Sequence, residues 1–355
     1  MEPQYLYAGD AGGSDREKFK LVIGDNVPSR IVEAIDRAMS EALVEFETLL
    51  GVGLDFQPAF FVTFREGDKM GWRGDVAGIA ASLRFWGNEW KTMNPNDLEA
   101  RIRLFVRHET FHYWGSRLFQ FKSETSDPWL HEGTADYFAN LGKSDITSVV
   151  HACWQSRPLG RVPTSGRSVY DCGHAINLLG DVLLKGTGLT MVDVWRRIFN
   201  DSGDSYDVND FFNNANQLGM SDDFETLAMV FLRSSEQAEL EPIIRRTGIT
   251  GNYGVLDESK ASFALMHILS SNCTGSHGFW MEKDRLRLDA PNCVGGLEGR
   301  DRTEVVSIDG TNLLQDARAV FKAVNVKCGT DQPLRFSTPE GENFLVKCGR
   351  SISVE

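Results

Sequence analysis

Two histidines and a glutamate near residue 110 have the types and spacing of a metal-dependent catalytic site. His108 and His112 stand one helical turn apart, and Glu109 lies between them. Residues four apart on a helix share one face, so both imidazoles can bind one metal ion. The glutamate can then take a proton from an activated water molecule. Because so short a pattern also occurs by chance, two unrelated surface histidines are the alternative.

The surrounding residues predict the helix that would position this pattern. Leu98 to Val106 carries apolar residues at helical spacing and contains neither glycine nor proline. A third ligand would distinguish a metal site from a chance match. The segment from Trp129 to Ala139, a second predicted helix, can supply it through Glu132.

The two segments together resemble the glutamate-zincin metallopeptidases, which include the aminopeptidase N and glycyl aminopeptidase families. After the H-E-x-x-H pattern comes W-L-x-E-G-x-A-x-Y, and Trp114 matches an aromatic residue that often follows the second histidine. The resemblance implies one Zn²⁺ per chain, bound by His108, His112 and Glu132, with Glu109 as the general base. Three protein ligands leave one coordination position open, as catalytic zinc requires.

The loop between the two motifs is one residue longer than in the aminopeptidase N family. The family spacing would place the third ligand at His131, but the following G-x-A-x-Y pattern aligns with Glu132. His131 would then point elsewhere, and the cleft is one possibility. Asp136, one turn after Glu132, could orient a ligating imidazole, or it could be a solvated helix charge.

Tyr170 and His174 lie on a later predicted helix. The segment Tyr170-x-x-Gly173 is similar to the family segment whose tyrosine stabilises the oxyanion formed when water attacks a carbonyl. A phenol suits this role because it donates a hydrogen bond without carrying charge. His174 follows one turn later and could contact the substrate, or it could be an ordinary packed or surface histidine.

A strand predicted from Val76 to Phe85 precedes the histidine helix. Gly78 and several alanines would let another backbone approach closely. Metallopeptidases of this type pair an edge strand with the substrate backbone, and Gly78, Ile79 and Ala80 are the candidate residues. A tightly packed internal strand is the alternative.

The pattern of elements predicts an α+β fold in two domains. Residues 1–250 are expected to form a thermolysin-like catalytic domain, with a mixed sheet in 1–97 and the zinc helix and further helices in 98–250. Residues 255–355 are expected to form a small mainly-β domain, with strands that include Phe263 to Leu269 and a helix from about Leu313 to Val324. The run before that helix looks like part of a PDZ-like module, and a small β-sandwich would give a similar pattern.

Composition narrows the classes of partner. The formal charge of −13 argues against a nucleic-acid partner, and no apolar run is long enough to span a bilayer. No secretory signal is apparent at the N-terminus, which fits either a cytoplasmic protein or a mature chain with an added methionine. The six cysteines fall in three sequential pairs. Disulfides would favour the periplasm or the exterior, and six buried thiols are the alternative.

These features predict a zinc-dependent peptidase that acts on peptide or protein substrates. Aminopeptidases of the first family bind the substrate amine through a glutamate in a G-x-M-E-N strand, and Gly78 to Ser82 contains no acid. Cleavage at the N-terminus and cleavage within the chain are therefore both open. One alternative is a non-catalytic protein with a retained zinc site and a peptide-binding C-terminal module. Another is hydrolysis of a non-peptide bond.

Overall fold

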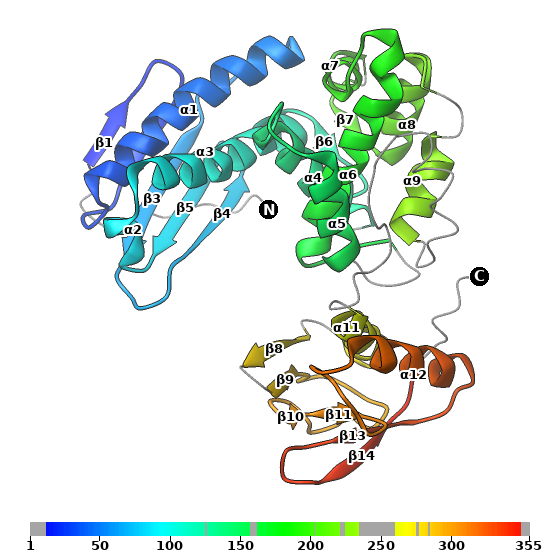
Figure 1. Ribbon diagram of the computed structural model, residues 1–355. Helices are drawn as coiled ribbons and strands as arrows, with labels where there is room; N and C mark the ends of the chain where they lie inside the picture. The colour runs from blue at the N-terminus through cyan, green and yellow to red at the C-terminus, as the bar shows by residue number, and fades with distance from the viewer. Residues whose placement is uncertain are drawn as a thin grey trace. The chain divides into compact units, whose positions relative to one another are not determined.

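The chain has a mixed α and β structure, as predicted, and it divides into two compact units. The first comprises Met1–Ile146 and Val169–Glu225, and the second comprises Thr147–Ser168 and Thr226–Glu355. The computed structural model describes residues 12–124, 126–156, 162–201, 203–220, 224–233, 260–274, 277–282 and 285–348. Figure 1 labels the helices and strands of both units.

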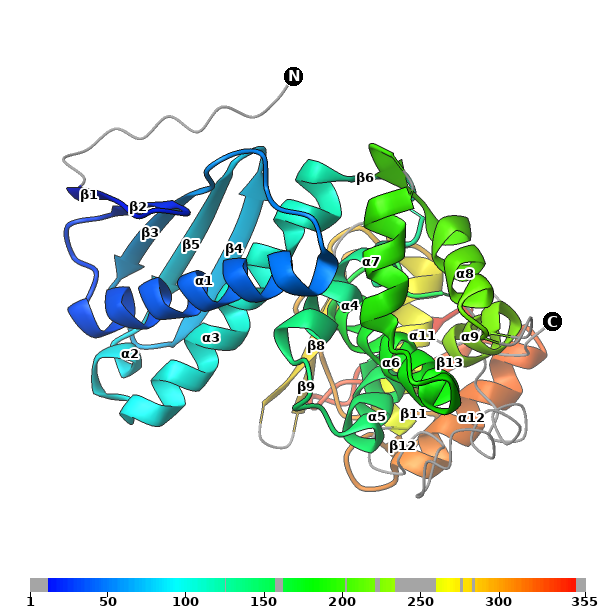
Figure 2. The ribbon, with the colours of Figure 1, turned by 90° about the horizontal axis from the view of Figure 1, so that it is seen from above.

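A five-stranded sheet forms the N-terminal part of the first unit. Its strands are β1 (Gly12–Asp15), β2 (Lys20–Ile23), β3 (Ala59–Arg65), β4 (Gly71–Ala77) and β5 (Ala80–Trp86), in the order β1-β2-β3-β5-β4. Strand β3 is parallel to β2 and β5, whereas β4 is antiparallel to β5 and lies at one edge. Helix α1 (Ser29–Leu50) connects β2 to β3 and runs across the sheet (Figure 2).

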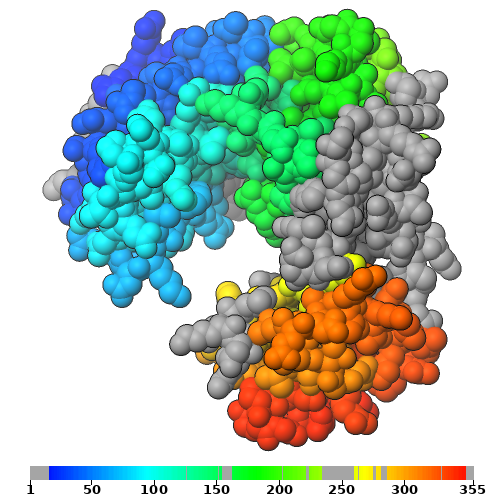
Figure 3. Space-filling model, in the orientation of Figure 1, coloured from blue at the N-terminus to red at the C-terminus, as the bar shows by residue number. Residues whose placement is uncertain are grey.

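Buried aromatic residues attach the sheet to helix α3 (Pro95–His112), which carries both histidines. Phe60 of β3 and Phe85 of β5 are fully buried or nearly so. Phe85 contacts Phe105 with ring centroids 5.6 Å apart, and Phe60 contacts Tyr113 at 5.4 Å. Helix α3 also packs along α1, and the side chains of these two helices adjoin in the space-filling view (Figure 3). The helix predicted around Leu98 to Val106 is confirmed as part of α3.

The single strand predicted from Val76 to Phe85 is wrong. The chain turns at Gly78, which has a φ of 58°, so β4 and β5 form a hairpin whose ends are Ala77 and Ala80. A positive φ suits glycine because it has no Cβ atom. The small residues in the run looked like a strand near a ligand, but they belong to a tight turn and its flanks.

The remainder of the first unit is mainly helical. Its longer helices pack their aromatic residues together: the rings of Phe111 and Phe138 stack 4.5 Å apart, and Trp195 lies against Phe211 at 5.4 Å. The elements from residue 89 to 233, some of them shared with the second unit, are α2 (Glu89–Thr92), η1 (Tyr113–Leu118), β6 (Gln120–Phe121), α4 (Pro128–Ala139), α5 (Ile146–Ser156), α6 (Arg167–Leu184), η2 (Lys185–Thr187), α7 (Met191–Asp201), β7 (Ser205–Tyr206), α8 (Val208–Gln217) and α9 (Phe224–Arg233).

In the described residues, no single helix has the length and hydropathy needed to cross a bilayer. The pair Arg167–Thr187 and Met191–Asp201, bent by 98°, meets the length and composition criteria only when taken together.

The C-terminal part of the second unit combines two small sheets with two helices. The three-stranded sheet has the order β10-β9-β8 and the four-stranded sheet the order β12-β11-β13-β14. Helices α11 and α12 pack against each other. The elements are α11 (Lys260–Asn272), β8 (Gly278–Glu282), β9 (Arg285–Asp289), β10 (Glu304–Val305), β11 (Ser307–Ile308), β12 (Thr311–Asn312), α12 (Ala317–Gly329), β13 (Leu334–Ser337) and β14 (Asn343–Val346).

One predicted strand in this region is wrong. The apolar run from Phe263 to Leu269 lies inside helix α11, where Leu265, Ile268 and Leu269 are buried. A short apolar run does not distinguish a buried strand from a buried helix, and packing against α12 selects the helix. The composition change near residue 250 lies outside the described residues, and the PDZ-like character of the module stays a prediction.

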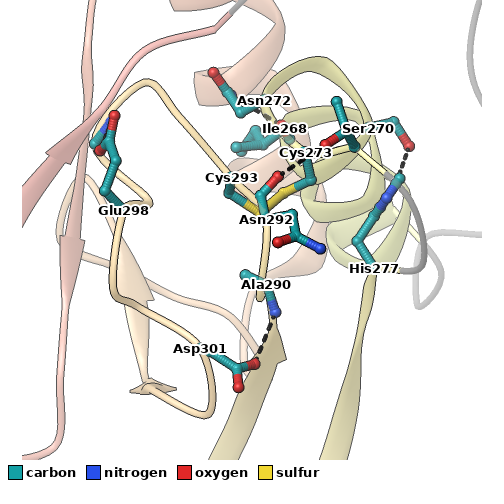
Figure 4. Close-up of a disulfide and its surroundings, with 12 residues drawn as sticks. Ile268, Ser270, Asn272, Cys273, His277, Ala290, Asn292, Cys293, Glu298 and Asp301 are labelled. Atoms are coloured by element: carbon teal, nitrogen blue, oxygen red, sulfur yellow. Dashed lines mark hydrogen bonds between the residues drawn. A yellow bond between two sulfur atoms is a disulfide. The ribbon is translucent and has the colours of Figure 1, made fainter.

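Disulfides hold this module together. Cys273, at the end of α11, is bonded to Cys293, and the labelled residues around this bond are drawn in Figure 4. Cys328 of α12 is bonded to Cys348 after β14. The side chain of Asn272 also donates to the carbonyl of Lys347 at 2.7 Å. Cys153 and Cys172 are disulfide-bonded as well, so none of the six cysteines is a free thiol.

Candidate active site

Helix α3 presents His108 and His112 on one face. The helix begins with Asn94, whose side chain accepts a hydrogen bond from the backbone of Asn96 at 2.9 Å, and Pro95 occupies the first turn. The two Nε2 atoms lie 3.2 Å apart. The chain then continues into the π-helical turn η1, a wide turn that often occurs at functional sites.

Helix α4 brings Glu132 to the same point. Its Oε2 lies 3.2 Å from Nε2 of His108 and 3.6 Å from Nε2 of His112. One donor atom from each of the three residues falls within 4.8 Å of the others. The structure therefore brings together the three residues that the sequence motifs select as ligands.

Two glycines allow α4 to approach α6 closely. A Cβ atom on Gly133 would lie 2.2 Å from Cα of Gly173, and one on Gly173 would lie 1.6 Å from the carbonyl oxygen of Trp129. Neither helix could carry a side chain at this crossing without moving. The close crossing places Tyr170, in the first turn of α6, beside His108, with ring centroids 5.6 Å apart.

Asp136 contacts His108 directly. Its Oδ1 lies 2.8 Å from Nδ1 of His108, one turn beyond Glu132 on α4. A carboxylate on Nδ1 orients the ring and leaves Nε2 to face a metal. Of the two roles considered for Asp136, this geometry favours orientation of the imidazole over a solvated charge.

Glu109 is buried beneath the edge strand β4. A Cβ atom on Gly74 would lie 2.1 Å from its carboxylate oxygen Oε1, so any larger residue here would force the Glu109 side chain to shift. Burial raises the pKa of Glu109 above its ordinary value. A carboxylate with a raised pKa is better able to accept and return a proton near neutrality. The sequence reasoning missed Gly74, whose only signal was a glycine inside the run Gly71 to Ala77.

Tyr170 is held as a neutral hydrogen-bond donor. Burial, together with the nearby carboxylates of Glu132 and Glu109, raises the pKa of its hydroxyl. The hydroxyl is also hydrogen-bonded to Glu132. A neutral phenol at this position can donate a hydrogen bond to an anion that develops beside the three ligands.

His131 lies next to the ligands but outside the set. Its ring is 4.4 Å from that of His112 and stacks on Phe121 at 5.8 Å. Burial and the neighbouring His112 lower its pKa to about 3, so the ring is neutral. The donor atoms that converge within 4.8 Å come from His108, His112 and Glu132, and His131 is not among them.

The remaining predicted residues lie outside this cluster or at its margin. His174 is buried, and its Nε2 is 3.0 Å from Oγ of Ser144. Gly78 and Ile79 form the turn of the β4–β5 hairpin, where Ile79 is 45% exposed, and Ala80 begins β5. The part of β4 that meets the cluster is Gly74.

The donor set fits a zinc ion. Two imidazoles and one carboxylate, with a fourth position open, are ligands that catalytic zinc sites use. Although burial opposes ionisation, the imidazoles of His112 and His108 lower the pKa of Glu132, so its carboxylate is anionic and could serve as a metal ligand. In the described residues, Nδ1 of His112 has no hydrogen-bond partner, whereas Nδ1 of His108 has Asp136. The imidazole of His112 is therefore positioned by packing and by the contacts of its Nε2, without a carboxylate on Nδ1.

No model of a known protein family matches the sequence, and no curated protein matches it. The fold is similar to that of an aminopeptidase N family protein from Idiomarina loihiensis, with a TM-score of 0.54 and 15% identity over 98% of this chain and 69% of that one. Aminopeptidase A from Legionella pneumophila, solved with aspartic acid, shares 16% identity over 64% of this chain and 28% of its own. Its TM-score of 0.48 is too low to establish a common fold. The first comparison establishes a peptidase-like fold.

Proposed function

We propose that this protein is a zinc-dependent peptidase whose catalytic unit is thermolysin-like. The observation that carries the proposal is the cluster of His108, His112 and Glu132, with Glu109 and Tyr170 beside it. Donor atoms of the three ligands converge within 4.8 Å. The similarity in fold to an aminopeptidase N family protein supports a peptidase-like activity.

Zinc would be held by His108, His112 and Glu132, and when bound it would supply a Lewis acid for water and a substrate carbonyl. Asp136 would keep the ring of His108 oriented, because it contacts Nδ1. Bulk water has little access to the two imidazoles, since both histidines are less than 10% exposed. The polar groups that remain would then act in a region of low dielectric constant.

Glu109 would move the proton. Its carboxylate would accept a proton from the attacking water and deliver it to the leaving amine. Gly74 limits the volume around this carboxylate, so the base would be held in one position by the β4 backbone. Tyr170 would donate a hydrogen bond to the oxyanion, a contact that stabilises the transition state more than the substrate.

Strand β4 would bind the substrate backbone. It is an edge strand, so one side of its backbone has no neighbouring strand in the described sheet. An extended peptide could add to this edge, and Gly74 would then bring the scissile region next to Glu109. We therefore place the proposed substrate contact in the middle of β4, and not at the hairpin turn of Gly78 and Ile79.

The position of Asp75 bears on which bonds would be cut. Neighbouring strand residues point to opposite faces, so Asp75 points away from the face on which Gly74 meets Glu109. Its carboxylate is paired with Arg84 on β5. The acid of β4 is thus turned away from a substrate amine. This arrangement favours cleavage within a chain, or an amine anchor elsewhere, and rates on free and N-acetylated peptides would separate the two.

Replacement of the base tests the proposal. Glu109→Gln should keep zinc at one ion per chain and should lower the rate of peptide hydrolysis by about 10²–10⁴-fold. Zinc content would be measured by elemental analysis, and activity on a broad peptide library. Hydrolysis at the wild-type rate by Glu109→Gln would exclude this mechanism. A wild-type protein that binds zinc but cuts nothing in the library would favour the non-catalytic alternative.

A further inference from the structure

Arg107, the residue before the ligand His108, has a buried guanidinium with four hydrogen bonds. The residue is only 3% exposed. Nε donates to the carbonyl of Ala139 at 3.1 Å, and Nη2 donates to the carbonyl of Phe138 at 2.9 Å. Nη1 and Nη2 donate to the two carboxylate oxygens of Glu45 at 2.7 and 2.9 Å. The guanidinium also lies 4.9 Å from the ring centre of Phe46.

Arg107 and its partners together lie on three helices. Arg107 is on α3, Phe138 and Ala139 are the last two residues of α4, and Glu45 is on α1. The last carbonyls of a helix have no partner within the helix and carry partial negative charge. A buried cation at that point satisfies the carbonyls and is stabilised by them. The planar guanidinium can serve both carbonyls and a carboxylate at once, which a lysine ammonium cannot do with the same geometry.

Two of these three helices, α3 and α4, carry all of the proposed metal ligands. Helix α3 supplies His108 and His112, and helix α4 supplies Glu132 as well as Asp136. The glycine crossing fixes how closely α4 approaches α6, but it does not tie α4 to α3. The two helices also meet through the stacked rings of Phe111 and Phe138. Stacked rings can slide, whereas hydrogen bonds from a fork of donors fix both distance and direction.

We propose that Arg107 is a positioning residue for the metal centre. It clamps the C-terminal end of α4 to α3 and thereby sets where Glu132 stands relative to His108 and His112. The clamp determines the zinc affinity of the site. This inference rests on the zinc-binding part of the proposed function and does not require that the protein cut peptides.

Groups that orient metal ligands typically change metal affinity by about 10- to 100-fold when they are removed. Arg107→Lys keeps the charge but loses the fork, so its zinc Kd should rise by about tenfold. Arg107→Met loses both the charge and the fork of donors, so its zinc Kd should rise by up to about a hundredfold. Arg103→Met is the matched control, since Arg103 lies one turn earlier on α3 and forms an ion pair with Glu41 at the surface. Its zinc Kd should stay within about twofold of the wild-type value.

The test is a zinc titration of the full chain in competition with a chromophoric chelator. It would be run at a temperature where the far-UV circular dichroism of each variant matches that of the wild type. The visible absorption of bound Co²⁺ would report ligand geometry separately, and it should change for the Arg107 variants alone. A purely structural role would lower the melting temperature without moving either readout.

A raised Kd in both Arg107 variants with an unchanged control supports the proposal, and wild-type Kd values in the folded Arg107 variants overturn it. If neither variant folds, Glu45→Gln decides, because it loosens the guanidinium while leaving Arg107 in place. A rise of a few fold in its zinc Kd supports the clamp, and an unchanged Kd overturns it. A wild-type chain that binds no zinc would instead remove the proposed function itself.

Discussion

The two units of this chain are stabilised in different ways. Every one of the largest fully buried side chains in the described residues belongs to the first unit, and these include Trp90, Trp114, Trp129 and Trp195. The buried residues of the C-terminal module are mostly aliphatic, such as Leu288, Ile308 and Val346. That module has two disulfides of its own, each joining cysteines 20 positions apart.

The units also differ in what they bury. The first unit buries histidines, carboxylates and Arg107, whereas Asn272 and Thr338 are the buried polar residues that the described C-terminal module contributes. Buried ionisable groups are costly unless they are paired, and holding them in place requires a rigid surrounding core. Large aromatic residues supply much contact area each, so they can build such a core. A small module lacks that volume and is stabilised by covalent links.

This difference indicates that packing in the first unit positions its ionisable side chains. In the second unit, the disulfides serve mainly to stabilise the fold. If so, small changes of shape in the first unit should alter activity, and changes to the cysteines of the second should alter only its unfolding.

Matched glycine substitutions in the two units should differ most. Gly74→Ala places a Cβ atom against the Glu109 carboxylate, so the base must move, and the hydrolysis rate should fall by about 10²–10⁴-fold. Gly278→Ala, in strand β8, meets no atom within 4 Å and should leave the rate unchanged. Steady-state kinetics on one peptide substrate would compare them. Equal rates for the two variants would contradict the assigned position of Glu109.

Removal of the Tyr170 hydroxyl should have the next largest effect. Tyr170→Phe keeps the ring beside His108 and loses one donor to the oxyanion, which typically lowers kcat by about 10²–10³-fold. Zinc content should not change, because Tyr170 is not one of the three ligands. Trp280→Phe, at an exposed position in the second unit, serves as the control. If kcat of Tyr170→Phe equals the wild-type value, Tyr170 has only a packing role.

Removal of a disulfide should affect the second unit alone. In the chain-entropy model, a loop of this size stabilises the folded state by about 3 kcal/mol. The double variant Cys273→Ser/Cys293→Ser should therefore unfold its module at lower denaturant concentration, while the peptidase rate stays at the wild-type level. Near-UV circular dichroism and kinetics would follow the two units separately. If the near-UV circular dichroism and the peptidase rate were lost together, the stability of one unit would depend on the other.

The smallest expected effect is the pH dependence of the stability that the Arg107–Glu45 ion pair contributes. The hydrogen bonds from Arg107 lower the pKa of Glu45, so the folded state favours its carboxylate. The resulting stability is fully present above the unfolded pKa of about 4.3 and is lost as pH falls through the lower folded value. The difference in Tm between the wild type and Glu45→Gln should be visible at pH 7 and should shrink below about pH 4. A difference that is constant from pH 7 to 3 would count against the ion pair.

Parts of the fold and of the site could be predicted because they depend on local pattern. The helix that became α3 has apolar residues at regular spacing, and the ligand residues lie in two short motifs. The hairpin at Gly78 and the helix at Phe263 were missed, since a few small or apolar residues fit a strand, a turn or a buried helix equally well. Gly74 was missed because its importance depends on Glu109, which is distant in the sequence.

The residues proposed to bind zinc could be identified from the sequence alone, because donor type and helical spacing are local properties. His108 and His112 share a face on any regular helix. The tertiary fold is needed to bring Glu132 to them, to place Asp136 against His108 and to place Gly74 against Glu109. These relations depend on the distance between separate helices and strands. That distance is set by packing, by the crossing at Gly133 and Gly173 and, as we propose, by Arg107, and no pattern within a single segment records it.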